Sequence, residues 1–333
     1  MSRYQTGLVV GKFSPLHFGH ELVIRAALAR CERVVILSYS RPEFPGCEAA
    51  RRAAWLGACF PEAIRVVLDA AQADLPTNDA SDDEHRAFAA EVIRVRTGRR
   101  IDAIFSSEAY GPGFALDLAR RQDAPVVHVA VDGMRSQAPV SGTALRQDVH
   151  GLRRFLPPVV YASFVQRIVL LGGESTGKST LAAALADALD TIHVSEYGRE
   201  LWVQRAGKID LPDMAGIARE QIRREETAVR SPGAHRYVVC DTSPLTTLLY
   251  SLDLFGRAGP ELSALSARQY DCTVLCDDDI PFVQDGTRRD PAFRTGQQTW
   301  YRERLAGRPY LVTRGPLADR VRELVAELNK KSG

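Results

Sequence analysis

Short apolar runs alternate with longer amphipathic segments along the first half of the chain. Apolar runs of about four to eight residues bounded by turn residues predict buried strands, and apolar residues at every third or fourth position predict helices. Strands are expected at residues 7–11, 33–40, 64–69, 101–107 and 124–131. Helices are expected between them at residues 21–31, 51–60, 85–98 and 114–122. This alternation predicts an α/β fold with an open parallel sheet.

The second half repeats the alternation, so the 333 residues are expected to form two domains. Its strands are expected at residues 168–171, 191–194, 236–242, 272–277 and 308–315. Its helices are expected at residues 181–189, 217–229, 246–255 and 317–331. Between the halves, the sequence Phe155-Leu156-Pro157-Pro158 interrupts a helix, because proline lacks the N–H that a helix interior needs. We therefore predict domains at residues 1–155 and 156–333.

A glycine-rich loop stands at the start of the second domain. Residues 172–179 fit GxxxxGK[ST], after an apolar strand and before a helix rich in alanine and leucine. Backbone N–H groups of such a loop cradle phosphate oxygens, and the helix N-terminus adds partial positive charge. Lys178 is expected to reach the β- and γ-phosphates of ATP, and the Ser179 hydroxyl to hold Mg²⁺. The other residues expected to bind ATP are Gly172, Gly173, Glu174, Ser175, Thr176, Gly177 and Thr180. The alternative is an ordinary strand–turn–helix with a chance lysine.

His17 and His20 stand just before the first predicted helix. They fit three interpretations: part of a zinc site, a capping pair at the turn, or donors of hydrogen bonds to phosphate oxygens. The third is favoured by Ser141-Gly142-Thr143-Ala144-Leu145-Arg146 near the end of the same domain. Its hydroxyls and backbone amides are expected to hold a triphosphate, whose charge Arg146 neutralises.

Composition narrows the function classes. A net charge of +2 gives no electrostatic basis for bulk nucleic-acid binding or for attachment to a membrane surface. No uncharged apolar run approaches the roughly 20 residues that span a bilayer, and the N-terminus lacks the features of a signal peptide. The six cysteines show no CxxC pair or zinc-like spacing. These features predict a cytoplasmic protein with structural thiols.

Longer strings make a family resemblance specific. His-x-Gly-His after a first strand, with Ser-Gly-Thr-x-x-Arg late in the domain, looks like the nucleotidylyltransferase superfamily. The strings GKFSPLHFGH, VSGTALR and RIVLLGGESTGKSTL resemble NadR-type bifunctional proteins over nearly the whole chain. The resemblance implies a Rossmann-like nucleotidylyltransferase domain followed by a P-loop kinase domain with a parallel sheet. Enterobacterial members also carry an N-terminal helix-turn-helix repressor domain. Only six residues precede the first predicted strand here, so no DNA binding is expected.

For the first domain, the resemblance implies nicotinamide mononucleotide (NMN) adenylyltransferase activity with Mg²⁺. The acceptor phosphate is already an anionic nucleophile, so the reaction needs positioning and charge stabilisation rather than a general base. The residues expected to hold the ATP phosphates are Lys12, His17, His20, Ser141, Gly142, Thr143 and Arg146. The expected acceptor contacts are Trp55, Asp132 and Arg135. Trp55 would either stack on the pyridine ring or belong to the core.

For the second domain, the resemblance implies ribosylnicotinamide kinase activity. Either Glu196 or Asp241 would accept the proton of the ribose 5′-hydroxyl; Glu196 is preferred as the base and Asp241 as the residue on the Mg²⁺ side. The alternative for each carboxylate is a helix N-cap or a surface ion pair. Arg288 and Arg289 resemble a lid that closes over the transferring phosphoryl group. The expected substrate contacts are Tyr197 and Arg199.

Two positions depart from the family pattern. Ser195 precedes the Glu-Tyr-Gly-Arg string where the NadR pattern has an aromatic residue, and Leu254 stands where a second ring-stacking aromatic residue is expected. Loss of an aromatic face removes roughly 1 kcal/mol of stacking on a nicotinamide ring. Phe255 or Tyr250 is the candidate replacement.

The expected function is a bifunctional NAD salvage enzyme. It would phosphorylate nicotinamide riboside with ATP and then adenylylate NMN to give NAD and pyrophosphate. The expected partners are ATP, NMN, nicotinamide riboside and NAD, without DNA or a membrane, and a homo-oligomer is left open. One alternative is a fused phosphopantetheine adenylyltransferase and dephospho-coenzyme A kinase, against which the EYGRE and DGTRR strings argue. The other is a nucleotide-sensing regulator with weak turnover.

Overall fold

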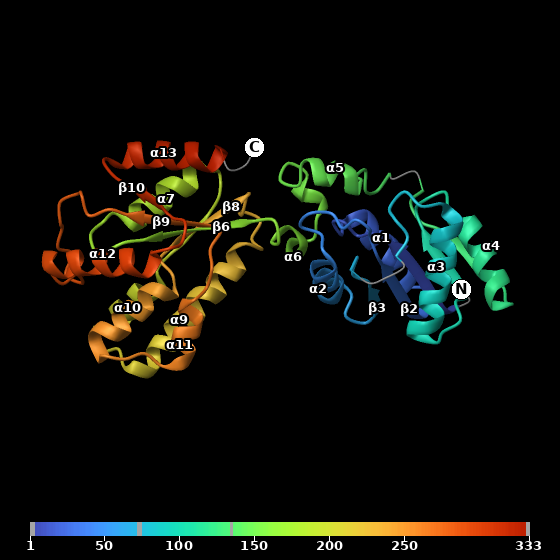
Figure 1. Cartoon of the computed structure of the whole chain (residues 1–333), viewed down its shortest axis with the longest axis horizontal. Helices are drawn as coiled ribbons and strands as arrows, with labels where there is room; N and C mark the ends of the chain where they lie inside the picture. Colours follow the sequence, from blue (N-terminus) through green and yellow to red (C-terminus); the bar gives the residue numbers. More distant parts are fainter. Residues whose placement is uncertain (1–3, 72–74, 134–135, 331–333) are drawn as a thin grey trace. The chain divides into compact units, whose positions relative to one another are not determined.

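The computed structural model describes residues 4–71, 75–133 and 136–330. The chain divides into two compact units, and the division falls between Phe164 and Val165. Each unit is built on a five-stranded sheet in which every pair of neighbouring strands is parallel. Helices cover both sheets (Figure 1). The predicted α/β fold class is confirmed. Within the described ranges, no helix combines the length and the apolar character needed to cross a membrane.

The N-terminal unit alternates strands and helices along the chain. Its strands are β1 (Tyr4–Gly11), β2 (Cys31–Ser38), β3 (Ile64–Val67), β4 (Ala103–Ser106) and β5 (Val127–Ala130). Its helices are α1 (Phe18–Leu28), α2 (Ala49–Cys59), α3 (Asp82–Thr97), α4 (Gly111–Gln122), α5 (Gly142–Gln147), the short 3₁₀-helix η1 (Arg153–Phe155) and α6 (Pro158–Tyr161). The strand order is β3-β2-β1-β4-β5.

This order places a candidate site at the carboxyl end of β1. The chain runs outward from β1 to β3 on one side and then returns to β4 on the other side. Ligands of open α/β sheets bind beyond the carboxyl ends of the strands, where the strand order reverses. Helices α3 and α4 cover one face of the sheet, where Ile93 and Leu118 pack with Leu8 of β1. The loop that follows β1 carries Lys12 and His17 to this reversal point.

The boundary between the units lies later than the expected one after residue 155. The indole Nε1 of Trp55 donates a hydrogen bond to Ser163 Oγ at 2.8 Å, and the Trp55 ring lies 5.9 Å from the ring of Phe164. Val160 is fully buried. The apolar residues that follow the two prolines therefore pack back onto the first unit, because burying them there removes their side chains from water.

The C-terminal unit also alternates strands and helices, with two successive helices before β8 and before β9. Its strands are β6 (Gln166–Leu171), β7 (His193–Val194), β8 (Tyr237–Asp241), β9 (Cys272–Cys276) and β10 (Leu311–Thr313). Its helices are α7 (Lys178–Ala188), α8 (Tyr197–Gln204), α9 (Leu211–Ala228), α10 (Pro244–Phe255), α11 (Pro260–Ser266), α12 (Pro291–Leu305) and α13 (Leu317–Lys330). The strand order is β10-β9-β6-β8-β7, with β6 in the centre.

Helices α7 and α13 cover one face of this sheet, through Leu181 and Leu185 of α7 and Leu324 and Leu328 of α13. Helices α8, α9, α10 and α11 share a second cluster, and Figure 1 shows α9, α10 and α11 on the other side of the sheet. The glycine-rich loop leaves the central strand β6 between these two layers. It is therefore supported by packed elements on both sides.

Three helices of the C-terminal unit, α8, α11 and α12, are absent from the sequence-based prediction. Helix α11 has only seven residues, and α12 has a polar sequence in which Gln297 and Gln298 are buried. A helix that buries amide side chains does not show the apolar periodicity that marks an amphipathic helix. The tertiary contacts of α12 explain these buried glutamines, as described below.

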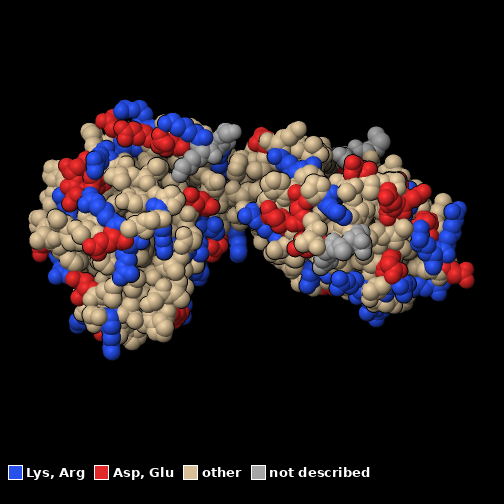
Figure 2. All heavy atoms as spheres, viewed as in Figure 1, with Lys and Arg blue, Asp and Glu red and all other residues tan. Residues whose placement is uncertain are grey.

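Basic and acidic side chains are mixed over the face of the molecule that Figure 2 shows. The mixture agrees with the small net charge of +2. Such a face lacks the basic stripe that marks a nucleic-acid footprint.

Candidate functional site

The N-terminal unit contains a cavity of about 510 Å³ beyond the carboxyl end of β1. It brings together two sequence segments that lie more than 100 residues apart. The predicted phosphate-binding residues that line it are Lys12, His17, His20, Ser141, Gly142, Thr143 and Arg146. All seven therefore lie around one space, as expected from the position of their loops at the strand-order reversal.

The two histidines form a stacked pair at the start of α1. The rings of His17 and His20 lie 3.7 Å apart with an interplanar angle of 27°, and the Phe13 ring meets His20 edge-on at 4.9 Å. His17 is the N-cap of α1, and its Nδ1 accepts a hydrogen bond from the Gly19 N–H at 3.1 Å. The capping interpretation is thus correct for His17. Because Nδ1 is an acceptor, the proton of a neutral His17 ring is on Nε2.

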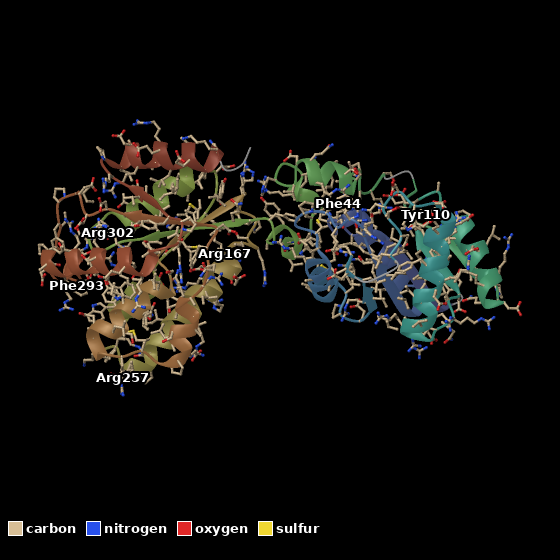
Figure 3. All side chains as sticks on the ribbon, viewed as in Figure 1. Phe44, Tyr110, Arg167, Arg257, Phe293 and Arg302 are labelled. Atoms are coloured by element: carbon tan, nitrogen blue, oxygen red, sulfur yellow. The ribbon has the colours of Figure 1, made fainter. Side chains whose placement is uncertain are left out.

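Arg146 is fixed in place by three contacts. Its Nη1 donates to the Ser14 carbonyl oxygen at 2.6 Å, and its Nη2 donates to Thr143 Oγ1 at 3.0 Å. Its guanidinium carbon lies 3.9 Å from the ring centre of Phe44, which also lines the cavity and is labelled in Figure 3. Ser141 caps α5 by accepting a backbone hydrogen bond at 3.1 Å. The guanidinium is therefore held against the cavity by packing as well as by hydrogen bonds.

The cavity is electrostatically suited to an anion. Burial lowers the pKa of the Lys12 ammonium, and the positive charge of Arg146 lowers it further, against an opposing effect of Asp79. Burial also lowers the pKa of the Arg146 guanidinium. Two cations held together in a half-buried space destabilise each other, and a polyphosphate relieves that repulsion. In the described part of the chain, no group of three or more His, Cys, Asp or Glu side chains is arranged to hold a metal ion.

The three residues expected to contact the acceptor nucleotide differ in where the structure places them. Trp55 is 1% exposed and is not among the residues that line the cavity, so the stacking role is wrong and the core interpretation is correct. Asp132 lines the cavity, but its carboxylate accepts hydrogen bonds from the backbone N–H groups of residues 136–138 and so shapes the turn before α5. Arg135 lies outside the described residues.

Four aromatic residues that line this cavity were not predicted, because no sequence motif marks them. Tyr39, His85, Tyr110 and Phe114 line it and come from β2, α3 and α4 or from the residue next to them. The Tyr39 hydroxyl and His85 Nδ1 are 3.0 Å apart, within hydrogen-bonding distance. Figure 3 labels Tyr110 in the N-terminal unit. These rings are the candidate surface for an acceptor base in place of Trp55.

The C-terminal unit contains a second cavity, of about 350 Å³, between the glycine-rich loop and helices α8, α9 and α10. The predicted residues that line it are Gly172, Glu174, Ser175, Thr176, Gly177, Lys178, Ser179, Thr180, Glu196, Arg199, Arg288 and Arg289. Gly177 has φ = +81°, a left-handed conformation that glycine adopts without strain, and α7 begins at the next residue. Lys178 Nζ donates to the carbonyl oxygens of Gly172 at 2.9 Å and Gly173 at 2.8 Å.

Helix α12 supports the glycine-rich loop, and sequence reasoning missed it. Gln298 Oε1 accepts from the Gly173 N–H at 2.9 Å, and Gln297 Oε1 accepts from the Glu174 N–H at 2.7 Å. The Gly173 N–H is therefore already used, and Gly173 is not among the cavity-lining residues. The structure differs from the expected phosphate contact of Gly173, because the Gln298 side chain accepts from its N–H.

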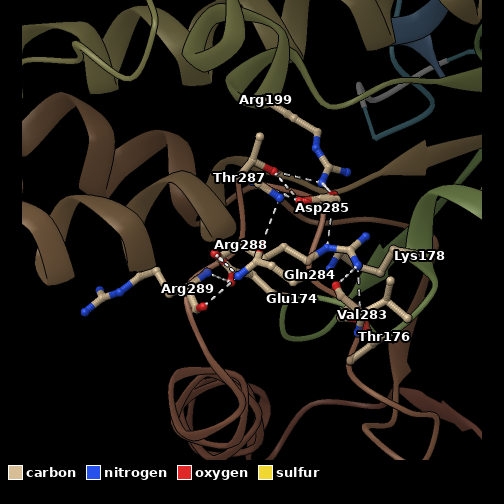
Figure 4. A network of polar contacts seen from close by, with 12 residues as sticks. Glu174, Thr176, Lys178, Arg199, Val283, Gln284, Asp285, Thr287, Arg288 and Arg289 are labelled. Carbon is tan, nitrogen blue, oxygen red and sulfur yellow. Dashed lines mark hydrogen bonds and ion pairs between the residues drawn. The ribbon is translucent and has the colours of Figure 1, made fainter.

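Residues 283–290, the lid segment, lie on the same loop (Figure 4). The Val283 N–H donates to Ser175 Oγ at 2.8 Å, and the Arg289 N–H donates to Glu174 Oε2 at 2.8 Å. The Arg288 guanidinium also donates to Ser175 Oγ, at 3.1 Å. The lid segment thus contacts the loop through Glu174 and Ser175, two residues that the motif GxxxxGK[ST] leaves unspecified.

The three arginines of this site have different partners. Arg199 donates to Asp285 at 2.5 Å, and this ion pair joins α8 to the lid segment. Arg288 Nε lies 3.1 Å from the same carboxylate. The Arg289 guanidinium forms an ion pair with Asp253 and lies over the Phe293 ring at 4.1 Å. Of the two arginines predicted to form a lid, Arg288 is therefore the one whose guanidinium lies at the loop.

Two carboxylates lie beside the loop, Asp241 buried and Glu196 half-buried. Asp241 ends β8, is 3% exposed, and among the described residues its Oδ1 has no hydrogen-bond partner. Glu196 occupies the N-cap position of α8 without a side-chain capping hydrogen bond. Burial, with a further contribution from the negative charge of Asp241, raises the pKa of Glu196 to about 7, although Lys178 opposes the shift. These carboxylates and the Ser179 hydroxyl supply the oxygen donors that Mg²⁺ prefers, so the group fits the implied metal.

The acceptor side of this cavity also has corrections. Tyr197 does not line the cavity; its ring packs in the helical cluster beneath the Arg224 guanidinium, 4.5 Å away. Leu254 lines the cavity and is 43% exposed, whereas Ser195 is not among the lining residues. Of the two replacement candidates, Tyr250 lines the cavity and Phe255 packs in the helical cluster instead. Sequence reasoning missed a further aromatic lining residue, Trp202 of α8.

Fold and sites together define an α/β nucleotide-binding protein whose C-terminal unit has the P-loop kinase fold. A family model described as an AAA domain matches residues 167–320. The chain is 28% identical over 304 residues to the protein named "Trifunctional NAD biosynthesis/regulator protein NadR" from Escherichia coli, covering 85% of this chain and 71% of that protein. The protein of the same name from Salmonella typhimurium matches with the same identity and coverage.

Solved structures agree with the fold of the whole chain. A crystal structure of NadR in complex with NAD and AMP-PNP matches with a TM-score of 0.65 and 19% identity, over 95% of this chain and 92% of that chain. A NadR structure in complex with NR matches with a TM-score of 0.62 and 20% identity, over 92% and 88%. The chain is thus similar to NadR proteins over most of its length, and this similarity supports an enzyme of the transferase kind.

Proposed function

We propose that the protein is a bifunctional enzyme of NAD biosynthesis. The C-terminal unit phosphorylates nicotinamide riboside with ATP, and the N-terminal unit transfers the adenylyl group of ATP to NMN, giving NAD and pyrophosphate. The observation that carries the proposal is the presence of two separate cavities in one chain, each lined by the cationic and hydrogen-bonding groups that polyphosphates need. The similarity to NadR proteins over 85% of the chain supports the choice of substrates.

In the N-terminal cavity the reaction depends on charge stabilisation. The 5′-phosphate of NMN attacks the α-phosphorus of ATP, and pyrophosphate leaves. Lys12 and Arg146 neutralise the phosphate charge, while His17 and His20 donate hydrogen bonds to phosphoryl oxygens. The packing of Arg146 on Phe44 fixes the guanidinium before substrate binds, so little reorganisation accompanies the reaction.

In the C-terminal cavity the reaction also needs a base. Glu196 accepts the proton of the ribose 5′-hydroxyl as that oxygen attacks the γ-phosphorus of ATP. A carboxylate whose pKa is about 7 suits this role, because it is partly ionised at neutral pH and still accepts a proton readily. Lys178 leaves the carbonyl oxygens of Gly172 and Gly173 for the β- and γ-phosphates, and Arg288 of the lid segment stabilises the transferring group.

The implied Mg²⁺ would be held by the Ser179 hydroxyl and the unpartnered oxygen of Asp241. When bound, such an ion neutralises charge on the phosphate oxygens. Asp241 is better placed for this role than for that of a base, because its Oδ1 is buried without a partner while Glu196 lines the cavity itself.

The test is incubation of the purified protein with Mg-ATP and one acceptor at a time, followed by product analysis. Nicotinamide riboside should give NMN and then NAD, and NMN alone should give NAD and pyrophosphate. Consumption of dephospho-coenzyme A in place of these acceptors would indicate the fused coenzyme A enzyme. Tight nucleotide binding without product from any acceptor would indicate a regulator and overturn the proposal.

A further inference from the structure

The C-terminal cavity has an apolar side formed by helices rather than by the glycine-rich loop. The apolar residues that line it come from α8, α9, α10 and the residues between α8 and α9: Trp202, Ile209, Met214, Ile217 and Leu254. The phosphate groups bind at the loop, so a second substrate that reacts there extends its remaining part toward this side. An apolar wall is suited to a flat, weakly polar group such as the base of a nucleoside.

Trp202 has the support that a stacking ring needs. A Cβ atom placed on Gly207 would lie 3.2 Å from Trp202 Cζ2 and 3.5 Å from Cε2, so the indole packs directly against the glycine backbone. Gly207 has φ = +78°, a conformation in which a residue with a Cβ atom is strained. Glycine is therefore favoured at this position, and its lack of a side chain allows the indole to approach the backbone. The described aromatic residues that line the cavity are Trp202 and Tyr250, and the Tyr250 hydroxyl is already bonded to Glu174.

The spacing along α8 suits a nucleoside. Glu196 is the N-cap of α8 and Trp202 follows six residues later, a rise of roughly 9 Å at about 1.5 Å per residue. A nucleoside with its 5′-hydroxyl at Glu196 can span this distance with its ribose and base. Trp202 therefore lies where the base of an acceptor would end.

Gln221 of α9 is a second, independent feature of the same side. It is 2% exposed and lines the cavity. Its Oε1 accepts a hydrogen bond from the Tyr197 N–H at 3.0 Å, which fixes the orientation of the side-chain amide. Within the described residues, its Nε2 has no hydrogen-bond partner. A buried donor without a partner is destabilising, and a ligand oxygen that accepts from it removes that penalty.

We infer that Trp202 and Gln221 form the subsite for the base of the acceptor nucleoside: the indole stacks on the ring, and Gln221 Nε2 donates to a carbonyl oxygen on it. The inference rests on the proposed function, in which the base is a pyridinium ring with a carboxamide. An indole face attracts a cationic ring more strongly than a neutral one, so the subsite favours a pyridinium over an uncharged base. Trp202 compensates for the non-aromatic residues at 195 and 254.

The experiment compares two acceptors in the full chain: nicotinamide riboside, and 3-methylpyridinium riboside, which keeps the charge but lacks the carbonyl oxygen. Gln221→Glu retains an acceptor for the Tyr197 N–H and removes the donor. It should lower kcat/KM for nicotinamide riboside about tenfold more than for the methyl analogue. The added negative charge acts on the pyridinium ring of both acceptors, whereas only nicotinamide riboside has a carbonyl oxygen for residue 221 to contact, so the difference between the two losses reports that contact.

Trp202→Leu should raise KM about fivefold to tenfold for both ribosides and leave KM for ATP unchanged, and Trp202→Phe should restore most of the loss. Val203→Ala is the matched control, because Val203 is 63% exposed on the same helix and does not line the cavity. Quenching of tryptophan fluorescence by nicotinamide riboside should disappear in Trp202→Phe, although Trp55 and Trp300 remain.

Equal losses for the two ribosides in Gln221→Glu would overturn the hydrogen bond, and an unchanged KM in Trp202→Leu would overturn the stacking. Either result leaves the proposed kinase activity intact if the unaltered protein phosphorylates nicotinamide riboside. If the unaltered protein accepts another nucleoside instead, the proposed function fails. The same variants measured with that nucleoside then decide whether its base binds at Trp202 and Gln221.

Discussion

The two cavities hold candidate polyphosphate sites built in opposite ways. In the N-terminal unit, charged side chains from residues 12–20 and 141–146 meet across the carboxyl end of β1. In the C-terminal unit, one continuous loop provides most of the groups, and its lysine rests on the loop's own carbonyl oxygens. The comparison teaches that a site built from charged side chains needs a packing contact for each side chain. A site built from a backbone loop needs contacts that fix the conformation of the loop.

Those supports differ accordingly. Arg146 lies against the Phe44 ring, and the His17 and His20 rings stack on each other. The glycine-rich loop is instead held by Gln297 and Gln298 of α12 through its N–H groups. Removing a group from one cavity should therefore leave the reaction of the other unaffected.

The largest effect is expected for Lys178→Ala. This change removes the ammonium that neutralises the β- and γ-phosphates and should reduce phosphorylation of nicotinamide riboside about 10³-fold or more. Formation of NAD from NMN should stay within about twofold of normal. Both rates are measured by product chromatography on the same folded protein. A comparable loss in the two reactions would mean that the cavities do not act separately.

His20→Ala should show the reverse pattern. Loss of one hydrogen-bond donor to phosphoryl oxygens should slow NAD formation from NMN about 10²-fold. Phosphorylation of nicotinamide riboside should be unaffected, because His20 lines the N-terminal cavity and does not line the C-terminal cavity. Retention of full adenylyltransferase activity would exclude the imidazole pair from the phosphate site.

The pH dependence should separate the two reactions by about tenfold. Since the Glu196 pKa is raised to about 7, the carboxylate is mostly protonated at pH 6 and mostly ionised at pH 8. A base works only when ionised, so kcat/KM for phosphorylation should rise roughly tenfold between these values. NMN formation in Glu196→Gln should be slow and nearly independent of pH. NAD formation should change only about twofold, through ionisation of the NMN phosphate. Parallel profiles would contradict the assignment of a base to one cavity only.

The smallest effect is expected for Phe44→Leu. The leucine keeps an apolar contact beneath Arg146 but removes the ring face, so KM for ATP in NAD formation should rise about threefold. The change should leave KM for ATP in phosphorylation unaltered, which serves as the internal control. A change in kcat without a change in KM for ATP would contradict the proposal that Phe44 helps ATP binding by packing against Arg146.

The contiguous site was predictable from the sequence, and the scattered one was predictable only in part. The string from Gly172 to Ser179 specifies strand, loop and helix together, because each residue type has a fixed place in that turn. The N-terminal site was connected across residues 12–20 and 141–146 by residue types that suit phosphate and by the family resemblance. Its aromatic residues Tyr39, His85 and Phe114 carry no local pattern, since strand, helix and loop residues meet there only through the fold.

The departures from the expected site contacts share one physical cause. Trp55 was expected at a ligand, but its ring is buried against the segment that follows Pro158. Gly173 was expected at a phosphate, but its N–H is bonded to Gln298. In both cases a distant part of the chain occupies a group that local sequence leaves available. A local sequence pattern indicates what a residue is able to bind. It does not determine which distant residue or ligand the folded chain brings into contact with it.

The sequence by itself determined the α/β class, the two-unit organisation and the position of the glycine-rich loop, because periodicity and turn residues act over short distances. Only the tertiary structure decided which carboxylate lines the cavity, that α12 supports the loop, and that Trp202 and Gln221 line the same cavity as Glu196. These features depend on contacts between residues far apart in the chain. Such contacts form when the sheets and helices pack, and no single stretch of sequence encodes them.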